Sequence, residues 1–238
     1  MGEPVTVKRS WKLFIFYLLV GLIVAGYFYL RRPAESLRTV HVMEFLRSPQ
    51  DHSEWMVKAG AQCGEAPFVF PTDGFIGYLW DDNFQAGHPH QGLDFFGGAD
   101  PGQVEVRAAY AGYLTRLPGW KSAVIVRIPH DPLQPDRQIW NYYAHMADPD
   151  GNSFISADFP AGTAEKFIKA GTLLGYQGDY SGDPLNPVGV HLHFSVVRDD
   201  GLGNFRNELD IANTLDPSPY FGLSLNANSN AGEIPLCK

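Results

Sequence analysis

The chain has 238 residues, of which 45% are hydrophobic and 18% are charged, a balance typical of a globular protein and not of a disordered one. Its formal net charge of −8 argues against nucleic acid as the main partner, because binding to phosphates requires clustered Lys and Arg. The 25 glycines, 18 prolines and 13% aromatic residues favour strands and turns over a helical bundle.

An uncharged apolar run covers residues 13–30 and follows a short N-terminal tail, residues 1–12. The run is close to the roughly 20 residues that cross a bilayer as a helix, and aromatic residues stand at both of its ends. A cleaved signal peptide is the main alternative, but its apolar region is usually shorter and ends in small residues, whereas this run ends in Tyr-Leu-Arg-Arg-Pro. We therefore expect a retained, single-pass transmembrane helix.

The charges beside this run do not decide its orientation. Three basic residues precede the run and three follow it, namely Lys8, Arg9 and Lys12 against Arg31, Arg32 and Arg38. We place the C-terminal bulk of the chain on the extracytoplasmic side of the cytoplasmic membrane, because of its cysteine pair and the function that its histidines indicate.

Residues 31–62 combine prolines, scattered charge and a poorly periodic apolar set, and we interpret them as a juxtamembrane stalk that could contain one helix. The apolar set is Leu37, Val40, Met43 and Leu46. From residue 63 to residue 238 we expect one domain of mainly antiparallel β-sheet, because short β-type runs alternate with Gly, Pro and Asp turns. The expected strands are residues 75–80, 104–108, 110–115, 123–128, 139–144, 172–176 and 191–197; residues 163–168 are expected to form a helical turn and residues 224–231 a loose tail.

The two cysteines, Cys63 and Cys237, stand at the two ends of this expected domain. In an oxidising compartment, a bridge between them would constrain the unfolded chain by about 5 kcal/mol in the loop-entropy model. Two unrelated reduced thiols are the alternative. We expect the disulfide, because the expected compartment favours it.

Five of the eight histidines fall in three short clusters. These clusters are Gly87-His88-Pro89-His90-Gln91-Gly92-Leu93-Asp94, Tyr142-Tyr143-Ala144-His145 and His191-Leu192-His193-Phe194. Imidazole and carboxylate groups together suit Zn²⁺, and a site with three protein ligands keeps a fourth position for the water that a hydrolase needs. A single His-x-His pair is more often incidental, but three such clusters in one compact domain predict a metal centre.

The spacing of His90 and Asp94 requires the backbone to bend between them if both are to bind one ion. Along a straight strand they would lie about 13 Å apart, too far to share one ion. Gly92 between them can adopt backbone angles that other residues avoid, so a bulge or tight turn there would bring the two side chains together. A helix would also pair positions four apart, but the glycines and the proline around the pair disfavour one.

His191 and His193 alternate with Leu192 and Phe194. In a strand, both imidazoles then face one side and both apolar groups face the other, so we expect the histidines to line a cleft and the apolar pair to enter the core. The spacing alone leaves open whether one or both histidines bind metal.

The other histidines and one tyrosine have plainer interpretations. We expect His88 at the rim of the site, His130 in an exposed hairpin loop, and His41 and His52 in the stalk. His145 taken alone could be a hydrogen-bonded core or rim residue. Tyr143 is interpreted as a packing residue, since an aromatic side chain in a strand usually packs.

Three motifs occur in the order His-Gln-Gly-Leu-Asp-Phe (90–95), Tyr-Ala-His-Met (143–146) and His-Leu-His-Phe (191–194). In this order and composition the chain resembles the lysostaphin-type zinc endopeptidases. The resemblance covers residues 68–198 and includes residues 71–76, 108–112 and 169–175. It implies a largely antiparallel β fold with the duplicated hybrid motif, and hydrolysis of peptide bonds in the crosslinks or stem peptides of peptidoglycan.

Carried over position by position, the resemblance implies one Zn²⁺ held by His90, Asp94 and His193, with His145 and His191 unligated beside it. We assign His191 as the general base and His145 as the partner of the oxyanion, and the two roles could be exchanged. The chain departs from the family pattern in residues 182–190 and at Ser195, where the family often has an acidic residue. These departures bear on substrate preference and leave the implied ligands in place.

Two other functions compete with hydrolysis. A non-catalytic protein that binds the cell wall or activates another wall hydrolase would keep the fold, but degenerate relatives of this kind typically lack metal ligands, all of which are present here. A phosphocarrier that uses a histidine pair as phosphate acceptor is the third candidate, and the expected membrane anchor and Asp94 count against it.

Overall fold

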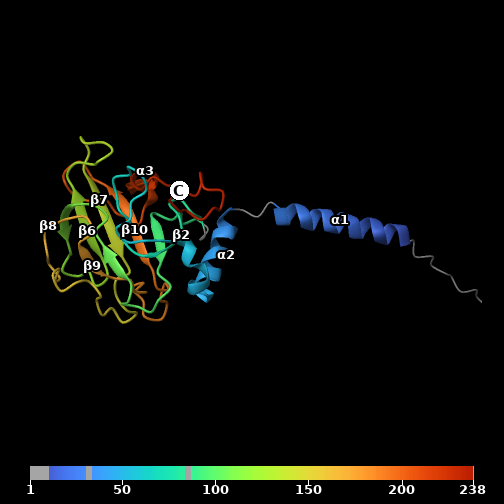
Figure 1. Cartoon of the computed structure of the whole chain (residues 1–238), viewed down its shortest axis with the longest axis horizontal. Helices are drawn as coiled ribbons and strands as arrows, with labels where there is room; N and C mark the ends of the chain where they lie inside the picture. Colours follow the sequence, from blue (N-terminus) through green and yellow to red (C-terminus); the bar gives the residue numbers. More distant parts are fainter. Residues whose placement is uncertain (1–10, 31–33, 84–86, 238) are drawn as a thin grey trace, which may run out of the picture. The chain divides into compact units, whose positions relative to one another are not determined.

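The computed structural model describes residues 11–30, 34–83 and 87–237 (Figure 1). Residues 1–10 of the expected N-terminal tail and residues 31–33 of the expected stalk lie outside the described part. The chain divides into two compact units, residues 1–33 and residues 34–238.

The first unit contains helix α1 (Trp11–Leu30). Its apolar side chains from residue 13 to residue 20 are exposed, as is Trp11. Among the helices whose residues the structure describes, none reaches the length and apolarity required to cross a bilayer.

The second unit is built on antiparallel sheet, which confirms the mainly antiparallel β-sheet expected for this domain. In the described part of the chain, one nine-stranded sheet has the order β1-β2-β3-β10-β7-β6-β5-β8, with β11 beside β10, and a two-stranded sheet pairs β4 with β9. The strands are β1 (Met56–Val57), β2 (Gly74–Tyr78), β3 (Leu93–Phe96), β4 (Glu105–Arg107), β5 (Gly112–Thr115), β6 (Val124–Ile128), β7 (Ile139–Ala144), β8 (Lys166–Ile168), β9 (Leu173–Tyr176), β10 (Leu192–Arg198) and β11 (Thr214–Leu215). Short helices are η1 (Pro49–Trp55), η2 (Ile211–Asn213) and α3 (Ser218–Phe221).

The main core lies against one face of the large sheet. Alternation along β10 sends Leu192, Phe194 and Val196 into this core. Val106 of β4 and Leu174 of β9 close the core from the small sheet. The opposite face of β10 therefore carries the odd-numbered residues, which include His193.

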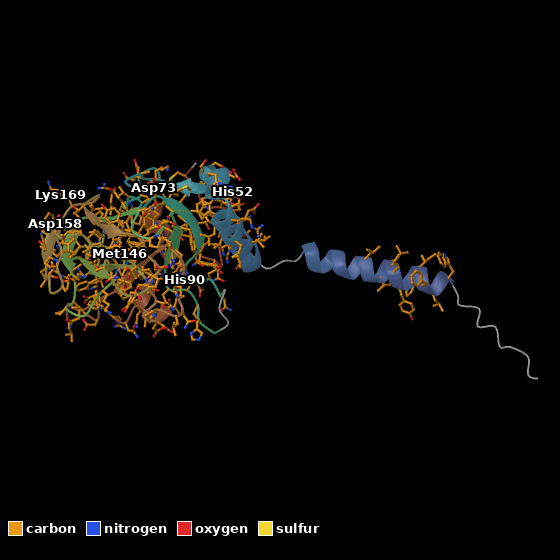
Figure 2. All side chains as sticks on the ribbon, turned by 90° about the horizontal axis from the view of Figure 1, so that it is seen from below. His52, Asp73, His90, Met146, Asp158 and Lys169 are labelled. Atoms are coloured by element: carbon orange, nitrogen blue, oxygen red, sulfur yellow. A yellow bond between two sulfur atoms is a disulfide. The ribbon has the colours of Figure 1, made fainter. Side chains whose placement is uncertain are left out.

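Helix α2 (Ala34–Arg47) belongs to the second unit, although the sequence suggests a stalk there. Its buried stripe is Arg38, Val42 and Phe45, and the two apolar members pack with Phe75 of β2 and Phe96 of β3. Figure 1 shows α2 beside β2, and Figure 2 shows His52 at this end of the unit with Asp158 and Lys169 at the opposite end. Apolar periodicity in the sequence does not reveal this stripe, because the first residue of the stripe, Arg38, is charged.

A buried ion pair neutralises that charge. Arg38 Nε lies 2.5 Å and Nη2 lies 3.0 Å from the two carboxylate oxygens of Asp82. The Arg38 side chain is 4% exposed and the Asp82 side chain 0%. Arg38, which counts among the basic residues after the apolar run, is therefore a structural residue of the β domain.

The helical turn expected at residues 163–168 is wrong. Glu165 has a φ of 49°, which a right-handed helix does not accept, and the chain continues as strand β8 along the edge of β5. Lys166 and Phe167 are exposed on this edge strand, while Ile168 is buried. Pairing supplies the backbone of β5 with partners on its outer side, which a helical turn would not do.

The expected disulfide between Cys63 and Cys237 is confirmed, with 5.3 Å between the two Cα atoms. The segment interpreted as a loose tail is packed, since Leu225 and Asn230 are buried and the Asn230 side-chain amide donates to the carbonyls of Ser224 and Glu233. The C-terminal segment therefore forms part of the domain.

Replacing Cys63 with serine is expected to lower the free energy of unfolding by about 2–4 kcal/mol, because the bridge closes a loop over 174 positions. Urea unfolding followed by tryptophan fluorescence would measure the loss. Cys237→Ser is the matched variant and should lose the same amount, and a reductant should destabilise only the natural chain. Equal stability of the natural chain with and without reductant would contradict the prediction.

Candidate metal centre

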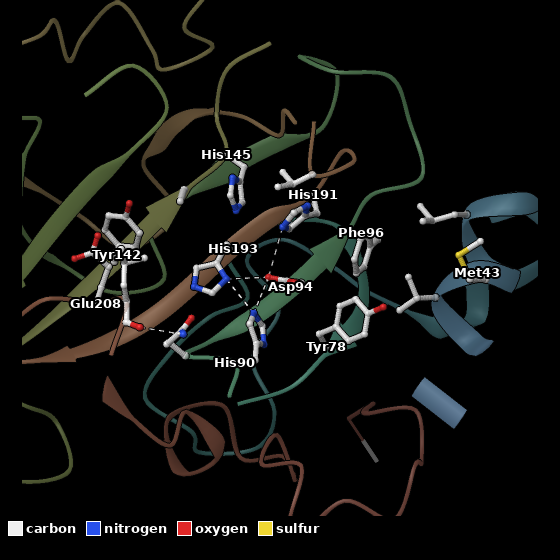
Figure 3. Close-up of a pocket in the computed structure, with 16 residues that line it drawn as sticks. Met43, Tyr78, His90, Asp94, Phe96, Tyr142, His145, His191, His193 and Glu208 are labelled. Atoms are coloured by element: carbon white, nitrogen blue, oxygen red, sulfur yellow. Dashed lines mark hydrogen bonds and ion pairs between the residues drawn. The ribbon is translucent and has the colours of Figure 1, made fainter. Parts of the chain in front are cut away.

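Neighbouring strands bring three of the implied site residues together. Asp94 on β3 and His193 on β10 are paired in register, directly opposite each other. His90 precedes β3, and its backbone N–H donates to the carbonyl of Asp82 at 2.8 Å. The three side chains meet on the face of the large sheet that does not carry the main core (Figure 3).

The chain bends at Gly92, as the spacing of His90 and Asp94 requires. The structure gives a different reason for the glycine than a positive φ. A Cβ atom at this position would lie 2.2 Å from the carbonyl oxygen of Phe194 on β10. Only glycine therefore allows the bend to lie directly against the neighbouring strand.

The candidate ligand atoms form a small triangle. Asp94 Oδ1 lies 3.1 Å from His90 Nε2 and 2.9 Å from His193 Nδ1, and the two nitrogens lie 3.1 Å apart. Ligands on a tetrahedral Zn²⁺ are separated by about 3.3 Å, given bonds of about 2.0–2.1 Å. Two imidazoles and one carboxylate in this geometry fit a zinc ion with one position left for water or substrate.

Hydrogen bonds on the far side of each ring orient the two imidazoles. His90 Nδ1 lies 2.9 Å from the carbonyl oxygen of Leu79, to which it donates, so Nε2 is left for a metal. His193 Nε2 lies 2.9 Å from Ser195 Oγ, so Nδ1 is left in the same way. Ser195, where the sequence departs from the family pattern, therefore contacts an implied ligand.

The charges of the cluster also suit a cation. Burial acts to raise the pKa of Asp94, but His90 and His191 outweigh it and hold this pKa well below its usual range, so the carboxylate is ionised at neutral pH. For His90, burial opposes protonation, but the charge and hydrogen bond of Asp94 raise the pKa. Burial lowers the pKa of His193.

His191 and His145 flank the triangle. The His191 Nε2 atom lies 3.6 Å from Asp94 Oδ1, and the ring centroids of His191 and His145 lie 4.6 Å apart. Each ring uses Nδ1 to donate to a backbone carbonyl, His191 to Gly189 at 2.9 Å and His145 to Tyr180 at 2.7 Å. Burial lowers the pKa of His145 and lowers that of His191 to about 4, so both rings are neutral at pH 7 with Nε2 as proton acceptor.

The backbone conformation at His145 directs its side chain to a different side of the sheet than strand alternation predicts. Strand β7 ends at Ala144, and strict alternation would send position 145 to the same side as the buried Tyr143. His145 instead has a φ of 70°, which turns the chain and puts the imidazole into the cavity. Of the three described non-glycine residues with positive φ, only His145 lines the cavity, and such angles cluster at functional sites.

A cavity of about 490 Å³ contains all five residues. Its described walls also include residues that the sequence did not indicate, namely Val42, Met43, Leu46, Tyr78, Phe96, Tyr142, Val188, Glu208 and Leu209. The sequence could have indicated Tyr142 as a cavity residue. Its neighbour in the strand, Tyr143, is buried in the core as expected, so alternation directs Tyr142 to the opposite face. Glu208 lies in an irregular loop and has no such signal.

The remaining histidines lie outside this cavity. His88 is exposed, and His130 is exposed with Nδ1 3.2 Å from the carbonyl oxygen of Pro135. His41 and His52 pack against Trp55, with ring centroids 5.3 Å and 3.9 Å from it.

Replacing Ser195 with alanine is expected to weaken zinc binding about 10-fold, because partners that orient a metal-binding histidine typically contribute 10–100-fold in affinity. Competition with a chromogenic chelator would measure the zinc affinity. Ser195→Thr, which keeps the hydroxyl, should stay closer to the natural chain. Equal affinities of the alanine variant and the natural chain would show that Ser195 does not orient His193.

No protein-family model and no curated protein matches the chain. Solved structures do resemble it. Lysostaphin from Staphylococcus simulans, an antimicrobial peptidase, is 18% identical with a TM-score of 0.39, over 70% of this chain and 55% of lysostaphin. Csd3 from Helicobacter pylori is 22% identical with a TM-score of 0.36, over 61% of this chain and 32% of Csd3.

A third similar structure is the catalytic domain of the prophage-encoded protein EnpA from Enterococcus faecalis, as a point mutant. It is 20% identical with a TM-score of 0.37, over 63% of this chain and 95% of that domain. The chain thus spans about half of lysostaphin and a third of Csd3, but almost all of the EnpA domain.

Proposed function

We propose that the chain is a zinc endopeptidase that hydrolyses peptide bonds in peptidoglycan crosslinks or stem peptides. The observation that carries the proposal is the triangle of His90 Nε2, Asp94 Oδ1 and His193 Nδ1, with sides of 2.9–3.1 Å, beside two neutral histidines in one cavity. The resemblance of the three sequence motifs to the lysostaphin type supports the choice of substrate.

The anchoring of the enzyme is part of the proposal. Residues 13–30 would hold the chain in the cytoplasmic membrane as a single-pass anchor, with the β domain on the extracytoplasmic side. The uncharged run supports the anchor, and the disulfide between Cys63 and Cys237 supports the compartment, since disulfides persist where conditions are oxidising.

His90, Asp94 and His193 would hold the zinc ion. When bound by three protein ligands, Zn²⁺ polarises the scissile carbonyl group and lowers the pKa of a water molecule at its open position. The bend at Gly92 and the outer hydrogen bonds of the two imidazoles direct the three ligand atoms towards one point.

His191 and His145 would move the protons. Both are neutral at pH 7 and keep their Nδ1 protons on backbone carbonyl groups, so Nε2 of either ring can accept a proton from the attacking water. We assign this step to His191, whose Nε2 lies 3.6 Å from Asp94. His145 would donate a hydrogen bond from Nε2 to the oxyanion after taking up a proton from solvent, which the developing negative charge favours, and the two roles could be exchanged.

Digestion of purified peptidoglycan by the full chain in detergent tests the proposal, with metal analysis of the protein and mass spectrometry of the products. We expect one zinc ion per chain and new peptide ends in the wall. A chelator should stop the release of fragments, and added Zn²⁺ should restore it. Zinc-loaded protein that releases no fragment from any wall type would instead favour the non-catalytic wall-binding protein.

A further inference from the structure

The cavity runs across the strands of the large sheet. Tyr78, Asp94, His193 and Ala144 stand opposite one another in register on β2, β3, β10 and β7. Four strands at about 4.8 Å spacing place the ends of this row about 14 Å apart, the length of about four extended residues. One short peptide can therefore reach from one end of the cavity to the other.

The β2 end of the cavity is apolar. Helix α2 contributes Val42, Met43 and Leu46, which lie beside Phe96. Met43 is 58% and Leu46 44% exposed, although the buried ion pair of Arg38 fixes the helix to the domain. This fixed apolar wall is continuous with the metal centre, so an apolar side chain of a bound peptide is the occupant that it fits.

The β7 end of the cavity is acidic. Tyr142 of β7 and Glu208 both line this end, and burial together with the Glu208 carboxylate raises the pKa of the Tyr142 hydroxyl, which therefore stays a donor. Gln91 Nε2 donates to the carbonyl oxygen of Leu209 at 3.1 Å and holds the loop of Glu208 at the cavity. Figure 3 shows Tyr142 and Glu208 on one side of the histidine cluster, and Phe96 and Met43 on the other.

Among the described residues that line the cavity, the acidic end has no basic partner. The described lining residues include Asp94 and Glu208 but neither Lys nor Arg. Under the proposed function, the metal compensates Asp94, and Glu208 keeps an uncompensated charge. An ammonium group is the complement that a half-buried carboxylate beside a tyrosine hydroxyl would bind.

We propose that the cavity selects its peptide at two points, an ammonium group beside Glu208 and Tyr142 and an apolar side chain against α2, on opposite sides of the bond that is cut. This inference rests on the proposed function and specifies its substrate class. The substrate is a peptide that carries a free amine and, within about four residues of it, an apolar side chain.

The acidic end is tested with soluble crosslinked wall peptides, used either with free amines or after N-acetylation, which removes their positive charge. We expect the natural chain in detergent to prefer the free-amine peptides about 10-fold in kcat/KM, the size of one hydrogen-bonded charge. Glu208→Gln should reduce this ratio to about one, because the amide no longer attracts the ammonium group. Glu233→Gln, an exposed carboxylate outside the cavity, is the matched control and should keep the ratio.

The apolar end is tested with Met43→Gln, which changes polarity with little change in volume. We expect KM to rise about 5-fold with kcat unchanged, because the lost contact is made equally in the ground state and the transition state. Met43→Leu, which keeps an apolar side chain at this position, should have the KM of the natural chain. Val40→Thr, exposed on the same helix but outside the cavity, is the matched control.

An equal kcat/KM for free-amine and acetylated peptides, or an unchanged ratio in Glu208→Gln, would overturn the acidic subsite while leaving hydrolysis intact. An unchanged KM in Met43→Gln would overturn the apolar subsite. If the zinc-loaded natural chain cuts neither peptide, hydrolysis itself fails. The dissociation constants of the two peptides for the natural chain and for Glu208→Gln then decide the inference, and equal constants refute it.

Discussion

Replacing His193 with alanine is expected to abolish zinc binding and peptide hydrolysis together. His193 Nδ1 is one corner of the ligand triangle, and its loss leaves only His90 and Asp94 to hold the ion. Replacing His145 with alanine should instead keep one zinc ion per chain and lower turnover about 10²–10⁴-fold, the usual contribution of an acid–base group. Metal analysis of the purified variants and rates of wall digestion measure both effects.

The contrast between the two variants separates metal binding from proton transfer. His130→Ala is the matched control, since this exposed histidine lies outside the cavity, and it should keep both zinc and activity. Full activity of His193→Ala would exclude the proposed zinc mechanism. Loss of zinc from His145→Ala would mean that His145 is a ligand and not an acid–base group.

Replacing Arg38 with alanine is expected to lower the free energy of unfolding by about 3–5 kcal/mol, because it leaves the carboxylate of Asp82 buried without its charge partner. The effect should extend to the site, since the backbone carbonyl of Asp82 accepts the N–H of His90. Urea unfolding gives the stability, and limited proteolysis reports whether α2 has left the domain.

A control on the same helix isolates the ion pair. Arg47 is exposed in the last turn of α2, and Arg47→Ala should change the stability by about 0.5 kcal/mol or less. The double variant Arg38→Met with Asp82→Leu removes both charges and should recover much of the loss. If Arg38→Ala costs no more than Arg47→Ala, the ion pair does not hold α2 in place.

Three strands of the β domain follow closely from local pattern, whereas β1, β3, β8 and β11 correspond to no expected strand. The run at residues 139–144 coincides with β7, and the runs at residues 123–128 and 191–197 match β6 and β10 within one residue at each end. These strands alternate or are β-branched, and pairing with neighbours on both sides reinforces that preference. Residues 163–168 did not follow local pattern, because the open edge of β5 required a partner there.

Helix α2 illustrates a limit of apolar periodicity. The apolar set Leu37, Val40, Met43 and Leu46 lies mostly on the exposed side, whereas Arg38 begins the buried stripe. An arginine in a sequence does not by itself predict a buried position. Its partner Asp82 is 44 positions away, and only the fold brings the two charges together.

Residue types and short spacings already indicate the composition of the candidate site: three clusters that carry two imidazoles, a carboxylate and two further histidines, and a glycine where the chain must bend. These features were readable because they depend on residue type and on spacing within a few positions. Tertiary structure alone decided the rest, since it depends on contacts between distant segments. The close approach of Gly92 to β10, the turn that brings His145 into the cavity, the contact of Ser195 with His193, and the two cavity ends formed by α2 and Glu208 all arise from strand pairing and packing.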